Sequence, residues 1–203
     1  MRLLVTLVVC CCLGVVLGVT AATMAQDQKM SDEQMAAAMQ EWMKLAAPGE
    51  HHKNLDYFVG KWTTTTKTWM AGPESTPTET KGASEIKWIM DGRFLLEDHK
   101  GQMMGMPYTG MGLVGYDNYR NMYSHHWINN MGTNVMAMSG HVDPSGKVFT
   151  FYGEMDEPML KITGRTIKYV TTIKGPDQYV FEVIDLHASE NYKVFEMVYD
   201  RQK

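Results

Sequence analysis

The stretch Leu55–Trp69, LDYFVGKWTTTTKTW, decides the fold. A glycine and a tryptophan, Gly60 and Trp62, open a run rich in threonine, and threonine and tryptophan favour extended strands. We interpret this stretch as the first strand of a β-barrel. The rest of the chain is expected to supply further strands that close onto it.

The segments after this strand alternate with turn signals at short intervals and are rich in Val, Ile, Thr, Tyr, Phe and Trp. Strands are predicted near residues 57–70, 80–90, 93–104, 108–117, 121–130, 134–142, 147–154, 159–173, 178–187 and 191–200. A meander of this length leaves two exposed edges, and closure into a barrel removes both. We therefore predict an all-β fold, an antiparallel up-and-down β-barrel of about ten strands, with a two-sheet sandwich as the alternative.

The region before the barrel, residues 26–50, is predicted to contain a short N-terminal helix. Ser31 and Gln34 have the spacing of a capping box, and Pro48 follows the helix. Apolar side chains recur at helical spacing in this region, at Met35, Met39, Trp42, Met43 and Ala46. We expect this helix to pack on the barrel or to plug one end, with partner binding as the alternative. Residues 51–203 are expected to form the barrel domain.

The N-terminus has the pattern of a secretory signal peptide over residues 1–25. Arg2 precedes an uncharged apolar run and small residues follow it, so cleavage is expected near Ala22 or Ala25. An uncleaved membrane anchor is the alternative, although the run is shorter than the roughly 20 residues that a spanning helix needs. All three cysteines lie within this segment, at residues 10–12. The mature chain is therefore expected to be secreted or periplasmic, without a transmembrane span or a disulfide.

Several function classes are disfavoured by composition and motifs. The net charge of −4 argues against a nucleic-acid partner, because binding to phosphates requires a basic surface. No Gly-x-Ser-x-Gly elbow is present and no cysteine nucleophile remains after cleavage, so no catalytic residue is assigned. Gly110-x-Gly112 matches part of a dinucleotide fingerprint, but no βαβ unit follows it.

Turn chemistry places one group of side chains on a common face. Asp91-Gly92 fits a two-residue type I′ hairpin turn, which pairs Trp88 with Leu95. Side chains alternate between the two faces of a strand. The face of Trp88 therefore also carries Arg93, Glu97 and His99.

A second group shares a face across the hairpin around residues 130–132, namely Tyr123, His125, Trp127, Met136 and Met138. The turn at Asp143–Lys147 then leaves two alternatives open. A three-residue loop puts Val148, Thr150 and Tyr152 on this face and turns Phe149 and Phe151 to the outside. A bulge at Gly146 would shift that register.

The Gly60-x-Trp62 pair on a first strand, after a helical lead-in, resembles the pattern of lipocalins and the wider calycin group. In those barrels the tryptophan closes one end, and a basic residue late in the chain packs across it. The resemblance implies structural roles for Gly60 and Trp62, and it implies that Arg201 covers the tryptophan.

A broader set of motifs resembles the bacterial domain-of-unknown-function family 1579. The motifs occur in order, as His52-Lys53-Asn54-Leu55, Gly60-x-Trp62, Asp91-Gly92-Arg93, Gly110-x-Gly112, Gly115-Tyr116-Asp117, Trp127 and Gly140-His141-x-Asp143. The resemblance covers nearly all of residues 51–203 and implies a secreted bacterial β-barrel, but it implies no activity. The opening Leu and Gly-x-Trp are also similar to those of nitrobindin-type haem barrels.

The leading interpretation is a barrel that binds a small apolar or amphipathic molecule in its interior. The 19 methionines and the many aromatic residues suit an adaptable apolar wall. The candidate wall residues are Trp88, Arg93, Met111, Tyr116, His125, Trp127, Met136 and Met138. Within this set Arg93 is the candidate for an anionic headgroup, because its planar fork suits a carboxylate.

Three alternatives remain open. In the first, His125 binds a metal or haem together with Met136 or Met138, since thioethers suit soft copper; otherwise no cofactor is predicted. In the second, the barrel is an enzyme of unknown reaction. In the third, its interior is filled and it acts as an interaction module of the envelope.

Overall fold

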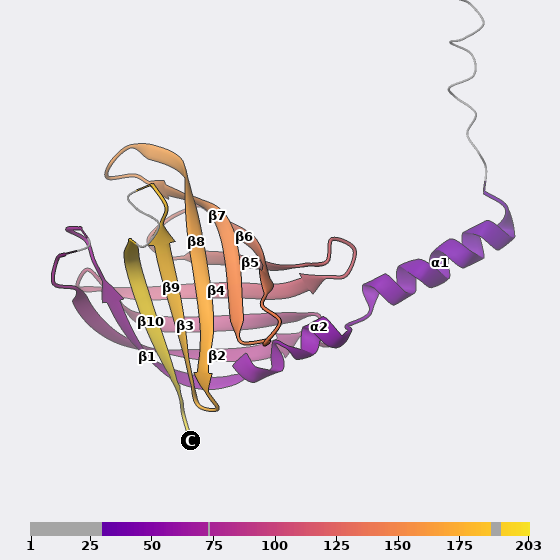
Figure 1. Ribbon diagram of the computed structural model, residues 1–203, viewed down its shortest axis with the longest axis horizontal. Coiled ribbons are helices and arrows are strands. Elements are labelled where there is room, and N and C mark those ends of the chain that lie inside the picture. The colour runs from indigo at the N-terminus through magenta and orange to yellow at the C-terminus, as the bar shows by residue number, and fades with distance from the viewer. Residues whose placement is uncertain (1–29, 73, 188–191) are drawn as a thin grey trace, which may run out of the picture. The chain divides into compact units, whose positions relative to one another are not determined.

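The computed structural model describes residues 30–72, 74–187 and 192–203, and the predicted signal peptide at residues 1–25 lies outside them. The described chain divides into two units between residues 44 and 45. The helical elements are α1 (Asp32–Ala46), α2 (Glu50–Lys53) and the short 3-10 helix η1 (Asp56–Phe58). The strands in Figure 1 are β1 (Gly60–Thr68), β2 (Thr78–Ile89), β3 (Phe94–Met103), β4 (Met106–Asp117), β5 (Met122–Asn129), β6 (Met136–Val142), β7 (Val148–Glu157), β8 (Ile162–Gly175), β9 (Gln178–Asp185) and β10 (Lys193–Arg201).

Helix α1 begins with the predicted capping box. The Ser31 amide donates to Gln34 Oε1 at 2.9 Å, and the Gln34 amide donates to Ser31 Oγ at 3.2 Å. Asp32 and Glu33 occupy the first turn, where negative charge complements the helix dipole. The packing of this helix on the barrel stays a prediction. None of the helices within the described ranges is long and apolar enough to cross a membrane.

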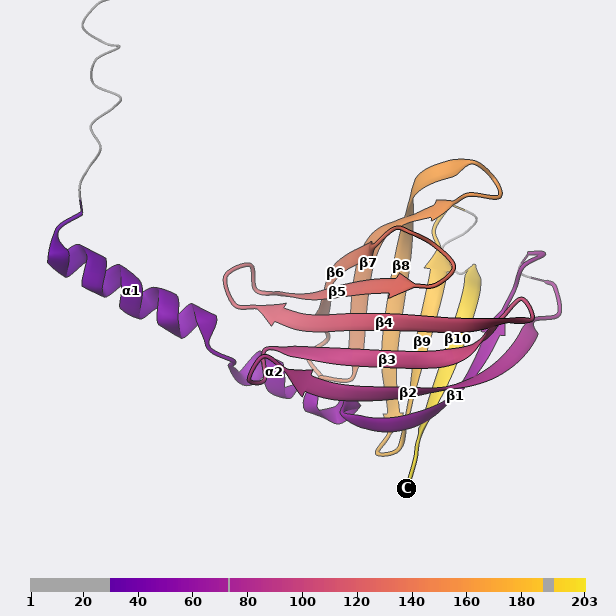
Figure 2. The same ribbon diagram turned by 180° about the vertical axis from the view of Figure 1, so that it is seen from behind.

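The ten strands form the predicted closed barrel. Each strand pairs antiparallel with the next in sequence, and β10 pairs with β1 from Trp62–Arg201 to Thr68–Phe195. This last pairing removes both sheet edges, so the two-sheet sandwich is wrong. Strands β2–β5 cross strands β8–β10 of the opposite wall at a large angle (Figures 1 and 2).

The first predicted hairpin is confirmed. Asp91 and Gly92 both have positive φ, at 54° and 80°, as a type I′ turn requires. The Arg93 amide donates to the Met90 carbonyl at 3.3 Å, and Trp88 pairs with Leu95.

The turn after β6 has four residues between its hydrogen-bonded ends, so the three-residue loop is wrong. The Asp143 amide donates to the Val148 carbonyl at 2.9 Å, and the Asp143 carboxylate accepts the Val148 amide at 3.0 Å. Hydrogen bonds to this carboxylate lower the pKa of Asp143. The resulting register turns Phe149 and Phe151 into the barrel, where both are almost fully buried.

One end of the barrel is closed by Trp62 and Arg201. Trp62 is completely buried, and its Nε1 donates to the Phe58 carbonyl at 2.8 Å. The guanidinium carbon of Arg201 lies 4.0 Å from the centroid of the Trp62 ring, which is the packing that the sequence resemblance implied. Two nitrogens of Arg201 donate to the carbonyls of Val59 at 2.8 Å and Tyr57 at 2.6 Å.

Two features require a glycine at position 60: its backbone conformation and the closeness of Arg201. Its φ of +136° is one that side chains with a Cβ rarely adopt. A Cβ at this position would also lie 2.8 Å from Arg201 Nη1. The glycine therefore lets the strand begin directly beneath the arginine.

The segment from Leu45 to Phe58, called the lead-in below, completes this closed end. Leu55 and Phe58 are buried in the core. Hydrogen bonds fasten the lead-in to strand ends: Asn54 Nδ2 donates to Tyr123 Oη at 3.0 Å, and Tyr57 Oη donates to the Gly175 carbonyl at 2.7 Å. The opposite end of the barrel is called the open end.

The two hydrogen bonds from Arg201 to the carbonyls of Tyr57 and Val59 predict a stability difference between two conservative substitutions. Arg201→Lys keeps the charge but cannot donate to both carbonyls in one fixed geometry, so the free energy of unfolding should fall by about 2 kcal/mol. Arg120→Lys is the matched control, because that side chain is 75% exposed and its loss should stay within about 0.5 kcal/mol. Urea unfolding followed by tryptophan fluorescence measures the free energy of unfolding of both variants. Equal losses would contradict a stabilising role for the Arg201 hydrogen bonds.

Candidate functional site

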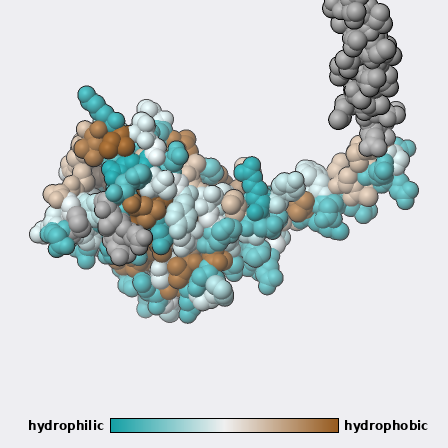
Figure 3. Space-filling view, turned by 45° about the horizontal axis from the view of Figure 1, so that its top comes forward, coloured by the Kyte–Doolittle hydropathy of each residue, from teal (hydrophilic) through white to brown (hydrophobic). Residues whose placement is uncertain are grey.

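The loops at the open end carry exposed apolar side chains. They join β1 to β2, β3 to β4, β5 to β6 and β7 to β8, and the exposed residues are Met70, Met104, Met131, Val135, Met159 and Leu160. Figure 3 shows one face of the molecule, on which apolar residues in brown lie among hydrophilic residues in teal. The rim at the open end therefore presents apolar contacts, whereas the other end is closed by the lead-in.

Four of the predicted wall residues face the lumen from two neighbouring strands. His125 pairs with Met138 and Trp127 pairs with Met136 across β5 and β6. Met138 is buried at 4% exposure, and the other three are half-buried. The sequence predicted this common face from hairpin parity.

Three other predicted wall residues lie at the closed end, where they contact the lead-in. Trp88 Nε1 donates to Asp56 Oδ1 at 2.9 Å, and Arg93 Nε donates to the Ala46 carbonyl at 3.0 Å. The Tyr116 ring stacks on His51 at 4.4 Å. Arg93 is thus engaged in fastening the lead-in, and the assignment of these three residues to a ligand-binding wall stays a prediction.

Met111, predicted as a wall residue, does not face the lumen, because it lies on the outer face of β4 and is 43% exposed. Its neighbours Gly110 and Gly112 face the lumen instead, since side-chain positions alternate along a strand.

The lumen contains a hydrogen-bonded group of polar side chains, of which the sequence placed Glu97 and His99 on one face but did not bring Ser84 and Tyr199 to them. Ser84 Oγ lies 2.7 Å from Glu97 Oε1 and 2.9 Å from His99 Nδ1. Tyr199 Oη donates to the same Glu97 oxygen at 3.0 Å. Ser84, His99 and Tyr199 are each at most 5% exposed, whereas Glu97 is half-buried. We call these four residues the polar cluster.

Burial dominates the protonation of the polar cluster. It raises the pKa of Glu97 above the usual value, although hydrogen bonds from Ser84 and Tyr199 favour the carboxylate. Burial lowers the pKa of His99 from 6.5 to about 4, so its imidazole is neutral near neutral pH. The cluster therefore contains one titratable acid and no cation.

Ser84 has one hydroxyl proton to share between an acid and an imidazole. When Glu97 is ionised, Ser84 donates to it and the His99 Nδ1–H donates to Ser84. When Glu97 is protonated, this order of donation can reverse. A nucleophilic triad instead places the imidazole between the hydroxyl and the carboxylate, so the polar cluster does not have that arrangement.

The ring of Trp127 lies over two glycines of β4. A Cβ added to Gly110 would lie 2.1 Å from Trp127 Cζ2, and one added to Gly112 would lie 3.1 Å from Trp127 Cε3. Trp127 Nε1 donates to Tyr108 Oη at 2.9 Å, which fixes the ring along the wall. The Gly110-x-Gly112 pair therefore makes room for an aromatic wall and does not bind a nucleotide in a βαβ unit.

Two buried polar atoms beside Phe181 lack a hydrogen-bond partner within the described part of the chain. They are Nε2 of His125 and the hydroxyl oxygen of Tyr169. Burial lowers the pKa of His125 to about 4 and raises the pKa of Tyr169 to about 12, so both side chains are neutral near neutral pH. Neutral side chains of this kind offer hydrogen bonds but no charge.

Metal ligands do not gather around His125 or elsewhere in the described ranges. No group of three or more His, Cys, Asp or Glu side chains there is arranged to hold a metal ion. Met138 pairs with His125 on the inner face, so the soft ligand pair expected from the sequence is placed on adjacent strands.

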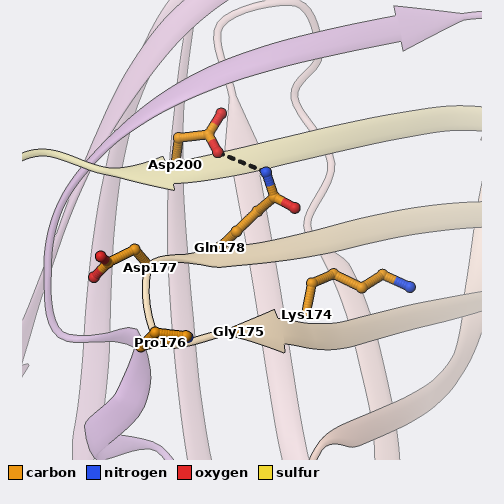
Figure 4. A pocket seen from close by; sticks show the side chains of 6 residues that line it. All are labelled: Lys174, Gly175, Pro176, Asp177, Gln178 and Asp200. Atoms are coloured by element: carbon orange, nitrogen blue, oxygen red, sulfur yellow. Dashed lines mark hydrogen bonds between the residues drawn. The ribbon is translucent and has the colours of Figure 1, made fainter.

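A surface hollow of about 380 Å³ lies outside the barrel, at the turn between β8 and β9 (Figure 4). Its lining residues are Lys174, Gly175, Pro176, Asp177, Gln178 and Asp200. Gln178 Nε2 donates to Asp200 Oδ1 at 2.8 Å, so two of its polar groups satisfy each other. The hollow is shallow and exposed, whereas the polar groups inside the barrel are buried.

Comparison with known proteins adds a family and a fold. The family model described as Protein of unknown function (DUF1579) matches residues 47–201. No curated protein matches the sequence. The crystal structure of Rv2717c from M. tuberculosis is similar, with 14% identity, a TM-score of 0.55, and coverage of 77% of this chain and 100% of that chain.

Two designed barrels are also similar at low scores. A de novo designed fluorescence-activating β-barrel has 14% identity and a TM-score of 0.40 over 72% of this chain and 95% of that one. The redesigned barrel mFAP0, bound to DFHBI, has 13% identity and a TM-score of 0.38 over 71% and 99%.

The buried imidazole of His125 predicts a pH-dependent loss of stability. Its folded-state pKa lies below the unfolded value of 6.5, so its contribution is present above pH 6.5 and is lost as the pH falls through about 4. The loss amounts to roughly 3 kcal/mol at most. His125→Gln should therefore lose less unfolding free energy on acidification than the parent protein, in urea titrations at several pH values. His141→Gln, exposed on the outer face, is the control and should follow the parent.

The close contact of the Trp127 ring with Gly110 and Gly112 predicts a second stability difference. Gly110→Ala should cost about 1–3 kcal/mol, because its Cβ overlaps the Trp127 ring. Gly175→Ala meets no atom within 4 Å and should change stability by less than about 0.5 kcal/mol. A double-mutant cycle with Trp127→Leu tests the cause: the cost of Gly110→Ala should shrink once the indole is gone, and an unchanged cost would contradict the proposed overlap.

Proposed function

The chain belongs to the DUF1579 family of proteins of unknown function, and for this member we propose that the barrel binds a small amphipathic molecule in its lumen, through the open end. The observation that carries the proposal is that two buried atoms near Phe181, His125 Nε2 and Tyr169 Oη, have no partner in the described chain; Thr64 Oγ1 and Arg165 Nε are further such atoms. Buried polar atoms nearly always have a hydrogen-bond partner, so two such atoms beside one aromatic ring suggest a bound group that supplies it.

Aromatic rings surround these two atoms. The centroid of the His125 ring lies 5.9 Å from that of Phe151 and 6.4 Å from that of Phe181. The Tyr169 ring stacks on Phe181 at 6.1 Å. A mostly apolar wall with a few convergent polar groups is the usual composition of a small-molecule site.

The inner side chains nearer the rim support access from outside. Trp127, Met136, Phe181 and Phe195 face inward, yet each keeps part of its surface accessible. Flexible thioethers allow such a wall to adapt to a ligand. The exposed apolar residues on the open-end loops would give an amphipathic molecule its first contacts.

Export is part of the same proposal. Cleavage near Ala22 or Ala25 would release a secreted or periplasmic binding protein. Its ligand would then be a molecule of the envelope or the medium.

A neutral fluorescent probe, N-phenyl-1-naphthylamine, tests the lumen. We expect saturable binding of one probe per chain, with the fluorescence increase typical of an apolar site. Met136→Trp narrows the inner wall and should weaken binding at least about tenfold, whereas Ala137→Trp points outward and should leave it unchanged. Unsaturable binding, or equal effects of the two substitutions, would overturn the proposal.

Elemental analysis and native mass spectrometry of the exported protein complete this test. A co-purified organic molecule at one per chain would support the proposal. Copper or haem at one per chain, lost in His125→Ala, would support the metal or haem alternative and contradict the simple ligand-binding function.

A further inference from the structure

We propose that the ligand of the lumen carries a protonated amine or another organic cation, held between the carboxylate of Glu97 and the ring of Trp127. This inference deepens the proposed function and rests on it. It assigns a ligand class to a site that would otherwise be defined only by its apolar wall.

Glu97 and Trp127 are neighbours across three strands. Glu97 pairs with Gly112 on β4, and Gly112 pairs with Trp127 on β5. A Cβ added to Gly112 would lie 3.4 Å from Glu97 Cβ and 3.2 Å from Trp127 Cζ3. Because Gly112 has no side chain, the Glu97 side chain and the Trp127 indole lie next to each other on the inner wall.

The Trp127 ring lies on the inner wall beside this place. One side of the ring covers Gly110 and Gly112, and its centroid lies 6.4 Å from that of the His99 ring. The hydrogen bond to Tyr108 holds the ring in this orientation, and the residue remains half-buried. The face of a tryptophan ring is the best aromatic surface for an organic cation.

No cationic side chain among the described residues forms an ion pair with the Glu97 carboxyl group. The polar and titratable side chains that face it are Ser84, His99, Tyr108, Tyr179 and Tyr199, and Asp98 is adjacent on the outer face. None of these is a cation near neutral pH, because His99 is neutral there.

Three partly buried cations have partners other than Glu97. Arg165 pairs with Asp185 at 2.6 Å, and Arg201 is held by the lead-in. Lys193 pairs with Glu182 at 2.7 Å. Desolvating a carboxylate without a countercharge is costly, so a cationic ligand would remove that cost whereas an anionic ligand would add to it.

Three ligands of equal chain length test the class: octylammonium, 1-octanol and octanoate, each titrated by calorimetry near neutral pH. Octylammonium should bind at least about tenfold more tightly than 1-octanol, and octanoate should bind least. Affinity for octylammonium should also fall on acidification, as Glu97 gains a proton and loses its charge.

Matched variants locate the effect. Glu97→Gln keeps the shape and an acceptor for Ser84 and Tyr199, so it should weaken octylammonium binding about tenfold and leave 1-octanol nearly unchanged. Asp98→Asn, on the outer face, should change neither. Trp127→Phe should keep more of the octylammonium affinity than Trp127→Leu, which provides a second measurement if Glu97→Gln does not fold.

The outcomes separate the two proposals. If 1-octanol binds and octylammonium binds no more tightly, or if Glu97→Gln leaves the ranking unchanged, the cation class is wrong and the lumen still binds ligands. If none of the three molecules binds, the cation class and the proposed function are both wrong.

Discussion

The packing of Arg201 across Trp62 is the interaction on which the rest of the barrel depends. It joins the last residue of β10 to the first strand, so it closes the ring of strands at the point where the two ends of the meander meet. The same guanidinium binds the carbonyls of Tyr57 and Val59, and this ties the lead-in to the closed end. The lead-in covers this end of the barrel. Closure of the sheet and closure of this end thus depend on the same side chain.

Closure also creates the polar cluster. Glu97 and Tyr199 are 102 residues apart in sequence and come within 3.0 Å only because β10 returns to β1. A neutral imidazole, a hydroxyl and a phenol then surround one acid, while two glycines leave space for the Trp127 ring beside it. A site that combines an aromatic face with an uncompensated carboxyl favours positive charge over neutral or negative groups. The proposed site would therefore select its ligand by charge as well as by shape.

The sequence predicted the features that depend on short-range rules, but not the contacts that form only when the barrel closes. Alternation and the Asp91-Gly92 turn predicted the strands and the pairing of Trp88 with Leu95. Hairpin parity also placed His125 and Met138 on one face. Met111 was misplaced because apolar residues usually face inward, and here its glycine neighbours do so to admit Trp127. The contacts of Trp88 and Tyr116 with the lead-in could not be predicted, because no local signal tells which end the lead-in covers. The partners of Glu97 depend on strands far apart in sequence.

The methionines provide the most direct test of the account, because they occur on both surfaces of the barrel. Met136 and Met138 face the lumen, whereas Met90 and Met111 are exposed, at 68% and 43%. The measurement is a titration of methyl-labelled methionine with N-phenyl-1-naphthylamine, followed by nuclear magnetic resonance. The account predicts that the Met136 and Met138 methyl signals shift to saturation at one probe per chain while those of Met90 and Met111 do not move. Shifts confined to the exposed methionines would contradict a ligand site in the lumen.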